Sequence, residues 1–504
     1  MTSGQPHLSK SKYLAGLQCE KRVWLACREP GLATPPDAAK RALFAMGTEV
    51  GKNAHRLFPG GALVSEGPAQ HARAVECTRA LLADAAVPAV FEAAFEHAGV
   101  RIRVDALERL AEGRFGLREV KASSRLKDEH IDDLAVQRFV LEGSGLEIAS
   151  TQLVHVNREY TRGEGEIDWL AFFERRECAD EVEEVLGEIP GRVEEMASIV
   201  AQGEPPHVDP GPHCRTPHAC EFWAHCTQRM PADWIFYLPN LRPGRFADLQ
   251  HSGYERISEL PDRETLSALQ TRVRDAVRSG RPFVSADLAA ALQRLEGSVW
   301  FLDFEAMNPA IPLYAGTKPF EAIPFQWSLH HLDRDGRVAH HEFLAEGPGD
   351  PRRALAESLI AALAADAGPI AVYSSYERTR LTALAAAFPD LADAIASLRD
   401  RLVDLLPIVK SHVYHPAFNG SFSLKDVAPA LVPGFAYGDL GEIQEGAAAA
   451  TSFTRIAGGQ TTPDETARLR RDLLAYCAHD TLALVEVYRA LRELALSPLG
   501  SARA

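Results

Sequence analysis

The sequence predicts a mixed α/β protein, with two α/β domains joined by a helical connector. Residues 88–160 leave a helical pattern for short strand patterns and then a helix and another strand. Residues 231–296 are largely helical in pattern. From Ser298, three strand patterns follow one another and then alternate with helices. We therefore expect domains at 1–230 and 297–504, with the connector between them.

Composition is that of an ordinary globular protein. The chain has 504 residues, which is enough for two to four domains, and 46% of them are apolar and 24% charged. Lys and Arg total 54 against 69 Asp and Glu, for a net charge of −15. This balance disfavours a protein that coats nucleic acid by bulk charge. It is compatible with an enzyme that has a local basic groove and metal-binding carboxylates.

The sequence predicts a cytoplasmic protein with no membrane contact. It has no run of 18 apolar residues, and its first 20 residues lack the apolar core of a signal peptide. Eight cysteines in so long a chain do not form a disulfide scaffold. In a reducing compartment, clustered cysteines are more typical of metal binding.

The N-terminal elements follow in order. Residues 1–60 have mainly helical patterns, and VFEAAFEHAG, VRIRVDALERL and RFGLREVKAS then predict strands with turns at Gly99 and Ala111–Gly113. IDDLAVQRFVLEG predicts a helix, and TQLVHVN another strand. We expect a long acidic helix over about 165–202, followed by the irregular Pro/His/Cys-rich segment EPPHVDPGPHCRTPHACEFWAHC.

The connector contains LRPGRFADLQHSGYERISELPD, which predicts a short helix, a Gly-containing turn and a second short helix. Such a unit resembles the helix–hairpin–helix elements that bind nucleic-acid backbones. A purely structural helical spacer is the alternative.

The C-terminal elements begin with the strands VWFLDFEAM, PFQWSLHHLD and RVAHHEFLAEG. The helix RRALAESLIAALAAD, the strand PIAVYSSYE and further helices follow, and ETARLRRDLLAYCAHDTLALVEVYRALREL closes the domain as a long amphipathic helix. This order of elements is the one expected of an RNase H-like fold.

Carboxylates mark a candidate site in this domain. Asp303 and Glu305 are two residues apart on an apolar strand, so both project from one face. Buried charges of this kind need compensation, which Mg²⁺ or Mn²⁺ ions provide. The alternative is two hydrated acids at a strand end. Tyr476 and Asp480 lie one helical turn apart, and Glu377 follows the strand AVY as a third acid.

FLDFE, a strand followed by an acid, and YxxxD resemble the DnaQ-like (DEDD) 3′→5′ exonucleases, in the branch that carries Tyr in its last motif. The resemblance spans about 298–495. It implies that two Mg²⁺ or Mn²⁺ ions bind at this site and that Tyr476 orients the attacking water. The implied metal ligands are Asp303, Glu305, Glu377 and Asp480.

The middle acid has two candidates. Glu377 stands where that family usually has Asp. Asp404, in LVDLLPIVK, is the rival, and we expect it to lie on a later element away from the metals.

A second constellation lies in the N-terminal domain. Asp105 ends one strand, and Glu119 and Lys121 share a face of the next. An Asp and a Glu together can hold a divalent ion, with the Lys beside a scissile phosphate or an activated water. An exposed cross-strand ion pair is the alternative. His55 lies on an upstream helix and Gln137 on the helix that follows.

This order of residues resembles the RecB-like PD-(D/E)XK nucleases, a restriction-endonuclease-like fold, and among them the iron–sulfur members such as AddB and the CRISPR-associated cluster nucleases. The resemblance covers 8–228, although position 141 is Leu where that group has Tyr. It implies one or two divalent ions, with Lys121 as the catalytic lysine and Gln137 in support. The implied metal ligands are His55, Asp105 and Glu119.

Four cysteines accompany this domain. Cys214, Cys220 and Cys226 are spaced six and six apart in the Pro-rich segment, and Cys19 stands far upstream. One cysteine before the core and three behind it resembles the cluster-bearing nucleases, which implies a [4Fe-4S] cluster held by four thiolates. Such a cluster would join distant segments of the chain.

Structural zinc is the alternative, with a histidine in place of one thiolate. The candidates are His213, His218 and His225. We interpret the scattered cysteines as small apolar residues. They are Cys27, Cys77, Cys178 and Cys477.

The whole chain resembles a family of uncharacterised bacterial proteins that fuse the two nuclease types. We therefore expect a metal-dependent nuclease with two active sites, acting on nucleic acid, with DNA favoured, in repair, recombination or defence. The alternatives are an RNA-processing 3′→5′ exonuclease and a nucleic-acid-binding protein with one inactive site. No residue pattern identifies a contact to a ribose 2′-hydroxyl.

Overall fold

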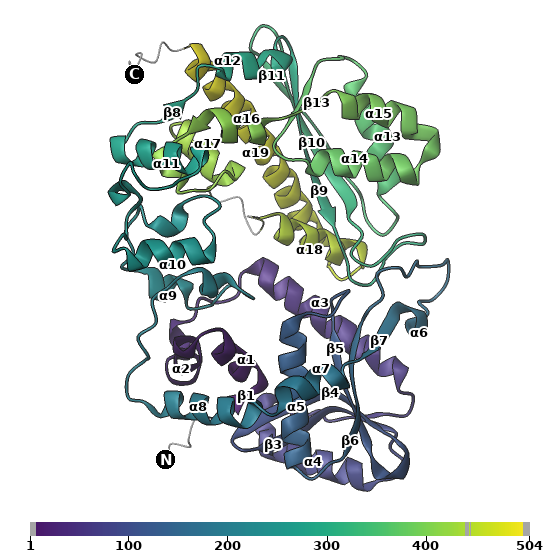
Figure 1. Cartoon of the computed structure of the whole chain (residues 1–504). Coiled ribbons are helices and arrows are strands. Elements are labelled where there is room, and N and C mark those ends of the chain that lie inside the picture. The colour runs from purple at the N-terminus through teal and green to yellow at the C-terminus, as the bar shows by residue number, and fades with distance from the viewer. Residues whose placement is uncertain (1–6, 439–442, 444, 497–504) are drawn as a thin grey trace. The chain divides into compact units, whose positions relative to one another are not determined.

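The structure is a computed structural model that describes residues 7–438, 443 and 445–496. It confirms a mixed α/β protein (Figure 1). The chain divides into two compact units. Unit 1 comprises Met1–Arg229 and Pro309–Glu321, and unit 2 comprises Met230–Asn308 and Ala322–Ala504.

Unit 1 has, within the described residues, a seven-stranded mixed sheet of order β2-β3-β4-β5-β6-β7, with β1 paired to β4. The pairs β1–β4, β2–β3 and β5–β6 are parallel, and the other neighbours are antiparallel. The predicted turns are confirmed, with Gly99 at φ +76° and a 3₁₀ turn at Ala111–Gly113. The strands are β1 Leu8–Ser9, β2 Ala62–Leu63, β3 Ala89–His97, β4 Val100–Arg109, β5 Phe115–Lys121, β6 Ile148–Val156 and β7 Phe173–Glu177.

Helices cover the sheet of unit 1. The helix α5 packs on β3, β4 and β6, and α1 packs on α5, whereas α3 packs on β5. Buried Tyr13, Leu134 and Leu153 belong to the main core between these elements. The helices are α1 Lys10–Gln18, α2 Glu20–Arg28, α3 Ala38–Ala54, α4 His71–Ala83, α5 Asp128–Gly143, α6 Trp169–Phe172, α7 Ala179–Leu186, α8 Ile189–Ala201 and α9 Trp223–Thr227.

The prediction of one long acidic helix over 165–202 is wrong. The structure has α6, the strand β7 and two separate helices there, α7 and α8. Phe172 and Phe173 are buried, and β7 pairs with β6 along the sheet edge, which the acidic pattern did not reveal. Pro190 lies in the first turn of α8, a position that Pro favours at a helix start.

The loop Pro309–Glu321, between β9 and β10, belongs to unit 1. Its Ala310 and Phe320 join an apolar cluster with Val50 and Tyr160. Two backbone hydrogen bonds to Arg162 fix the loop, from the Arg162 N–H to Thr317 at 3.0 Å and from Gly316 to Arg162 at 2.8 Å.

Unit 2 is built, within the described residues, on a five-stranded mixed sheet of order β11-β10-β9-β12-β13. The first three strands are antiparallel, and β12 runs parallel to both β9 and β13. A two-stranded ribbon pairs β8 with β14. The strands are β8 Phe283–Val284, β9 Val299–Met307, β10 Ile323–Leu332, β11 Val338–Leu344, β12 Ile370–Val372, β13 Leu402–Asp404 and β14 Val413–Tyr414.

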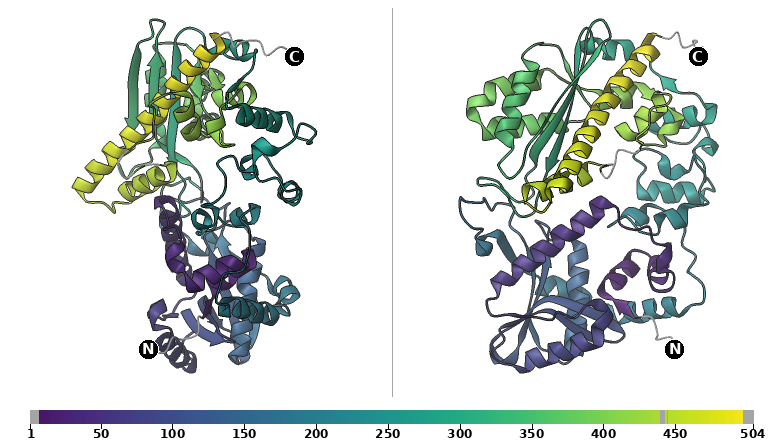
Figure 2. Two further views of the ribbon diagram at one scale, coloured as in Figure 1. Left: turned by 90° about the vertical axis from the view of Figure 1, so that its left-hand side faces the viewer. Right: turned by 180° about the vertical axis from the view of Figure 1, so that it is seen from behind.

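The central strand β9 is covered on both faces. Its Trp300, Leu302 and Phe304 pack in a core with α13, α14 and α15. The long helix α19 packs along the sheet against β9, β10 and β11 (Figure 2). The helices are α10 Pro243–His251, α11 Ala268–Ser279, α12 Leu288–Ala291, α13 Arg352–Leu363, α14 Tyr376–Ala387, α15 Ala392–Asp400, α16 Leu405–His412, α17 Leu424–Leu431, α18 Gly446–Ala457 and α19 Pro463–Leu496.

The connector pattern is confirmed in part. The first predicted short helix is α10, and Gly253 makes the turn at φ +85°. The second predicted helix is only a 3₁₀ turn, Ile257–Glu259, because Pro261 follows so closely. In the described part of the chain, no single helix is long and apolar enough to span a membrane, and one sharply bent pair, Tyr376–Ala387 with Pro389–Asp400, passes by length and composition alone.

Candidate functional site

The strand β9 places two carboxylates on the face that α19 covers. Asp303 and Glu305 are two residues apart, so they share this face, and only 7% of Glu305 is exposed. Burial, together with the charges of Asp480 and Glu377, raises the pKa of Glu305 to about 8. Burial and the neighbouring acids raise the pKa of Asp303 well above its ordinary value. The raised pKa values mean that ionising these carboxyl groups costs free energy, and a bound cation would stabilise their ionised form.

Helix α19 supplies the next residues. Asp480 follows Tyr476 by one turn, and burial raises the pKa of both side chains. The charge of Asp480 further raises the pKa of the Tyr476 phenol and of the Tyr437 phenol. Lys425 lies over both rings, with its Nζ 5.2 Å from the centre of Tyr476 and 5.7 Å from that of Tyr437. Its charge lowers the pKa of Glu305 and of Asp480 against these effects.

Glu377 joins the carboxylate group and Asp404 lies beside it. Glu377 is in the first turn of α14 and is 4% exposed, and its charge raises the pKa of both Asp303 and Glu305. Asp404 ends β13, next to β12, and caps α16 by accepting a hydrogen bond from the Leu406 N–H at 2.9 Å. Asp404 is thus closer to the site than we expected, since its charge raises the pKa of Glu377, but its carboxylate is engaged by a helix end.

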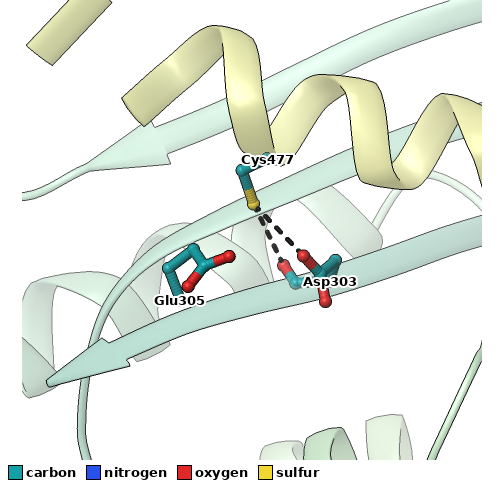
Figure 3. Close-up of side chains that lie close together, drawn as sticks. All are labelled: Asp303, Glu305 and Cys477. Atoms are coloured by element: carbon teal, nitrogen blue, oxygen red, sulfur yellow. Dashed lines mark hydrogen bonds between the residues drawn. The ribbon is translucent and has the colours of Figure 1, made fainter. Parts of the chain in front are cut away.

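Cys477 is the residue of this site that we interpreted as a simple apolar filler. It is fully buried, as that interpretation requires, but its Sγ also lies 3.6 Å from Oδ2 and 3.9 Å from the backbone oxygen of Asp303 (Figure 3). Ligand atoms of Asp303, Glu305 and Cys477 all lie within 4.8 Å of one another. Its position three residues before Asp480, on the same helix face, was the available signal.

A second buried group of charges lies in unit 1, between β4, β5 and α5. The Nζ of Lys121 lies 2.6 Å from Oε1 of Glu119 and 2.6 Å from Oδ2 of Asp133. Gln137 donates from Nε2 to Glu119 at 2.7 Å and to Asp133 at 2.9 Å. Asp105 accepts a hydrogen bond from the Val120 N–H at 2.7 Å. The structure thus brings together Asp105, Glu119, Lys121 and Gln137, four of the five residues that the sequence indicated.

The pKa values in this group are displaced in opposite directions. Burial and the charge of Glu119 raise the pKa of Asp105 to about 7. Burial by itself would also raise the pKa of Glu119. The positive charges of Lys10 and Lys121 outweigh this effect, so the pKa of Glu119 is lowered. The cluster therefore holds one firmly ionised carboxylate beside one that titrates near neutral pH.

Sequence reasoning missed two members of this group. Asp133 lies four residues before Gln137 on α5, so helical spacing from Gln137 was a usable signal. Lys10, the first residue of α1, lies 109 positions from Glu119 in the sequence, and its Nζ is 2.9 Å from Oε1 of Glu119. No local pattern points to a contact at that separation.

His55 does not join the carboxylates. Its ring stacks on Phe91, with 3.9 Å between the ring centres and 6° between the planes. Burial lowers its pKa. Among the described residues it makes no hydrogen bond or ion pair with Asp105 or Glu119.

The four cysteines line one pocket. They come from the end of α1 and from the Pro-rich segment, and the Gln18 side chain links these two parts by donating to the His213 and His218 carbonyls at 2.8 Å each. Arg22 and Glu221 add an ion pair at 2.7 Å. The residues concerned are Cys19, Cys214, Cys220 and Cys226.

The histidines near this pocket are placed differently from the thiols. His213 lines the pocket, and its Nε2 lies 3.5 Å from Sγ of Cys214. His218 instead pairs with Glu129 at 3.1 Å. In the part of the chain that the structure describes, no three of the cysteine and histidine ligand atoms here lie within 4.8 Å of one another. A tetrahedral zinc site with bonds of about 2.3 Å to sulfur requires closer spacing than this.

Comparison with known proteins assigns one segment. Residues 300–423 match a domain of unknown function (DUF2779). The matched segment begins on β9 and ends before α17, so it contains Asp303, Glu305 and Glu377 and leaves out α19. No curated protein matches the chain.

Proposed function

We propose that the protein is a metal-dependent nuclease with one active site in each unit. The observation that carries this proposal is the set of buried carboxylates from three separate elements in unit 2. Burial raises the pKa of all four acids, and the neighbouring acids raise those of Asp303 and Glu305 further, so ionising them costs free energy that bound divalent cations would offset. The four acids are Asp303, Glu305, Glu377 and Asp480.

In unit 2 these four carboxylates would hold two Mg²⁺ or Mn²⁺ ions. Such ions activate a water and stabilise the leaving oxygen of a phosphodiester. Tyr476, held next to Asp480 in a buried setting, keeps its proton and can donate a hydrogen bond that orients a water. These roles favour a DnaQ-like 3′→5′ exonuclease site, and the mixed five-stranded sheet of unit 2 is compatible with the RNase H-like fold expected from the sequence.

In unit 1 Asp105 and Glu119 would hold one or two divalent ions, as in RecB-like nucleases. Gln137 holds the Glu119 carboxylate in place at 2.7 Å. Lys121, on the same strand face as Glu119, would contact a phosphate of the substrate. His55 stacks on Phe91 and makes no hydrogen bond or ion pair with Asp105 or Glu119 among the described residues, so it is the least supported ligand of the proposed set.

The four-cysteine pocket fits a [4Fe-4S] cluster better than zinc. The four thiols are all present, and burial raises the pKa of those of Cys214, Cys220 and Cys226, so metal binding would be needed to hold them as thiolates. A cubane cluster held by four thiolates would use all four cysteines that line the pocket and would need no histidine ligand.

The proposed substrate is nucleic acid, with DNA favoured and RNA the alternative. Purified protein should be assayed with Mg²⁺ or Mn²⁺ on end-labelled single- and double-stranded DNA and RNA. We expect cleavage that EDTA abolishes and that proceeds stepwise from the 3′ end at the unit 2 site. Binding to these polymers without cleavage, under every metal condition, would instead favour a nucleic-acid-binding protein.

A further inference from the structure

The carboxylate group of unit 1 contains one more acid and one more cation than the sequence indicated. Lys10 and Lys121 each form ion pairs with both Glu119 and Asp133. The Nζ of Lys10 lies 2.9 Å from Oε1 of Glu119 and 3.3 Å from Oδ1 of Asp133. The Lys10 side chain is 22% exposed, whereas those of Glu119 and Asp133 are 2% exposed. This is a buried bridge rather than a surface ion pair.

Every oxygen of Glu119 and Asp133 already has a donor. The Lys121 ammonium donates to Oε1 of Glu119 and to Oδ2 of Asp133. Nε2 of Gln137 donates to the other two oxygens, Oε2 of Glu119 and Oδ1 of Asp133. Lys10 therefore adds a second cation to oxygens that are already satisfied. It takes the bridging place between two carboxylates that a divalent ion needs.

Gln137 provides an independent observation. Its side chain is fully buried and its Nε2 is fully engaged, yet its Oε1 has no hydrogen-bond partner. A buried acceptor without a donor is costly, because it has lost its hydrogen bond to water without replacement. Water carried by a bound ion would supply that donor, so this orphaned atom points to a ligand of the cluster.

We propose that Asp133 is a third metal-binding carboxylate of the unit 1 site and that Lys10 occupies the position of the ion in the metal-free chain. This deepens the proposed function of the same site. With Asp105, three carboxylates face two ammonium groups, a formal charge of −1. A divalent ion binds as Lys10 withdraws, which leaves the metal-binding carboxylates facing Lys121 alone.

Removing the Lys10 charge should therefore strengthen metal binding. We expect Lys10→Met to lower the Kd for Mn²⁺ at this site by at least about tenfold, a difference of about 1.4 kcal/mol. Binding of Mn²⁺ alone is to be measured by calorimetry and electron paramagnetic resonance on the full chain. The parent chain carries Asp303→Asn and Glu305→Gln so that the unit 2 site does not contribute.

Matched variants make the result specific. Lys10→Arg keeps the charge and should leave Mn²⁺ binding weak, and Lys12→Met, on the same helix, should leave it unchanged. Adding Asp133→Asn to Lys10→Met should remove the gain. Lys10→Gln repeats the test with a polar side chain, and thermal unfolding checks that each variant is folded.

Three outcomes would overturn the proposal: an equal Kd in the parent and in Lys10→Met, weaker binding in Lys10→Met, or a gain that survives Asp133→Asn. The readout is metal binding and not cleavage. A protein that binds Mn²⁺ as expected but cleaves no nucleic acid would refute the proposed function and leave this inference standing.

Discussion

The carboxylates of Asp303 and Glu377 belong to one buried site, although 74 positions separate them in the sequence. The charge of Glu377 adds to burial, and to the charges of Glu305 and Asp480, in raising the pKa of Asp303. The strand β12 runs parallel to β9, and Glu377 follows its end. The charge of Glu377 acting on Asp303 therefore favours Glu377 over Asp404 as the middle acid of the proposed metal site.

The first prediction compares these two acids. Glu377→Gln should reduce stepwise 3′-end digestion nearly as much as Asp303→Ala, because each change removes one carboxylate from the site. Asp404→Asn should reduce it little, since the Asp404 carboxylate caps α16. Rates on a 3′-end substrate, with circular dichroism to confirm folding, check this. A larger loss in Asp404→Asn than in Glu377→Gln would reverse the assignment.

The second prediction concerns Tyr476. Tyr476→Phe should keep the buried ring and lose only the hydroxyl beside Asp480, so digestion should slow by about 10- to 1,000-fold, as expected of a group that positions water. Asp303→Ala should abolish it. The two variants are to be compared at saturating Mg²⁺. Full activity in Tyr476→Phe would exclude a role for the hydroxyl.

The third prediction is a pH dependence of stability. The pKa of Glu305 is raised to about 8 and that of Glu377 to about 7. An acid with a raised pKa in the folded state binds its proton more tightly there than in the unfolded chain, so its contribution to stability is present at low pH and lost as pH rises. Metal-free protein should therefore lose stability between about pH 4.5 and pH 8 through these groups.

Thermal unfolding in EDTA across that range measures this effect. Glu305→Gln should flatten the decline, and Mn²⁺ should raise Tm more at the alkaline end, where the carboxylates are ionised. A Tm that rises steadily from acid to alkaline pH, both in the unsubstituted protein and in Glu305→Gln, would contradict the prediction.

The fourth prediction concerns the thiols. Protein purified without oxygen should be brown, with a broad absorbance at about 400 nm from thiolate-to-iron charge transfer. Cys19→Ala should bleach it and lower the stability of unit 1, because the proposed cluster would join Cys19, at the end of α1, to the Pro-rich segment. Cys27→Ala, on the neighbouring helix α2, is the matched control and should keep the colour. A colourless protein with stoichiometric zinc and no iron would refute the cluster.

Local patterns predicted much of the fold and most of the candidate sites. Alternation in VWFLDFEAM placed Asp303 and Glu305 on one face because a strand has a period of two. Helical spacing did the same for Tyr476 and Asp480 on α19. These relationships depend only on neighbours in the chain, which is why the sequence was enough.

The rest depends on tertiary contacts. Lys10 reaches Glu119 because β1 pairs with β4 and sets the start of α1 beside the sheet. Lys425 reaches the unit 2 site through the packing of α17 on α19. The prediction of one helix over 165–202 was wrong for a related reason, since part of this segment forms the strand β7 and pairs with β6. Charge and helical propensity carry no information on such pairing.

Two separate metal-dependent nuclease sites in one chain are tested most directly by assaying both sites in one set of variants. Glu119→Ala, Asp303→Ala and the double variant are to be compared on end-labelled and on circular DNA and RNA, with Mn²⁺, after each is shown to be folded. We predict that each single variant loses one activity and retains the other, and that the double variant loses both. Loss of all cleavage in a folded single variant, or cleavage that persists in the double variant, would contradict the proposal of two separate nuclease sites.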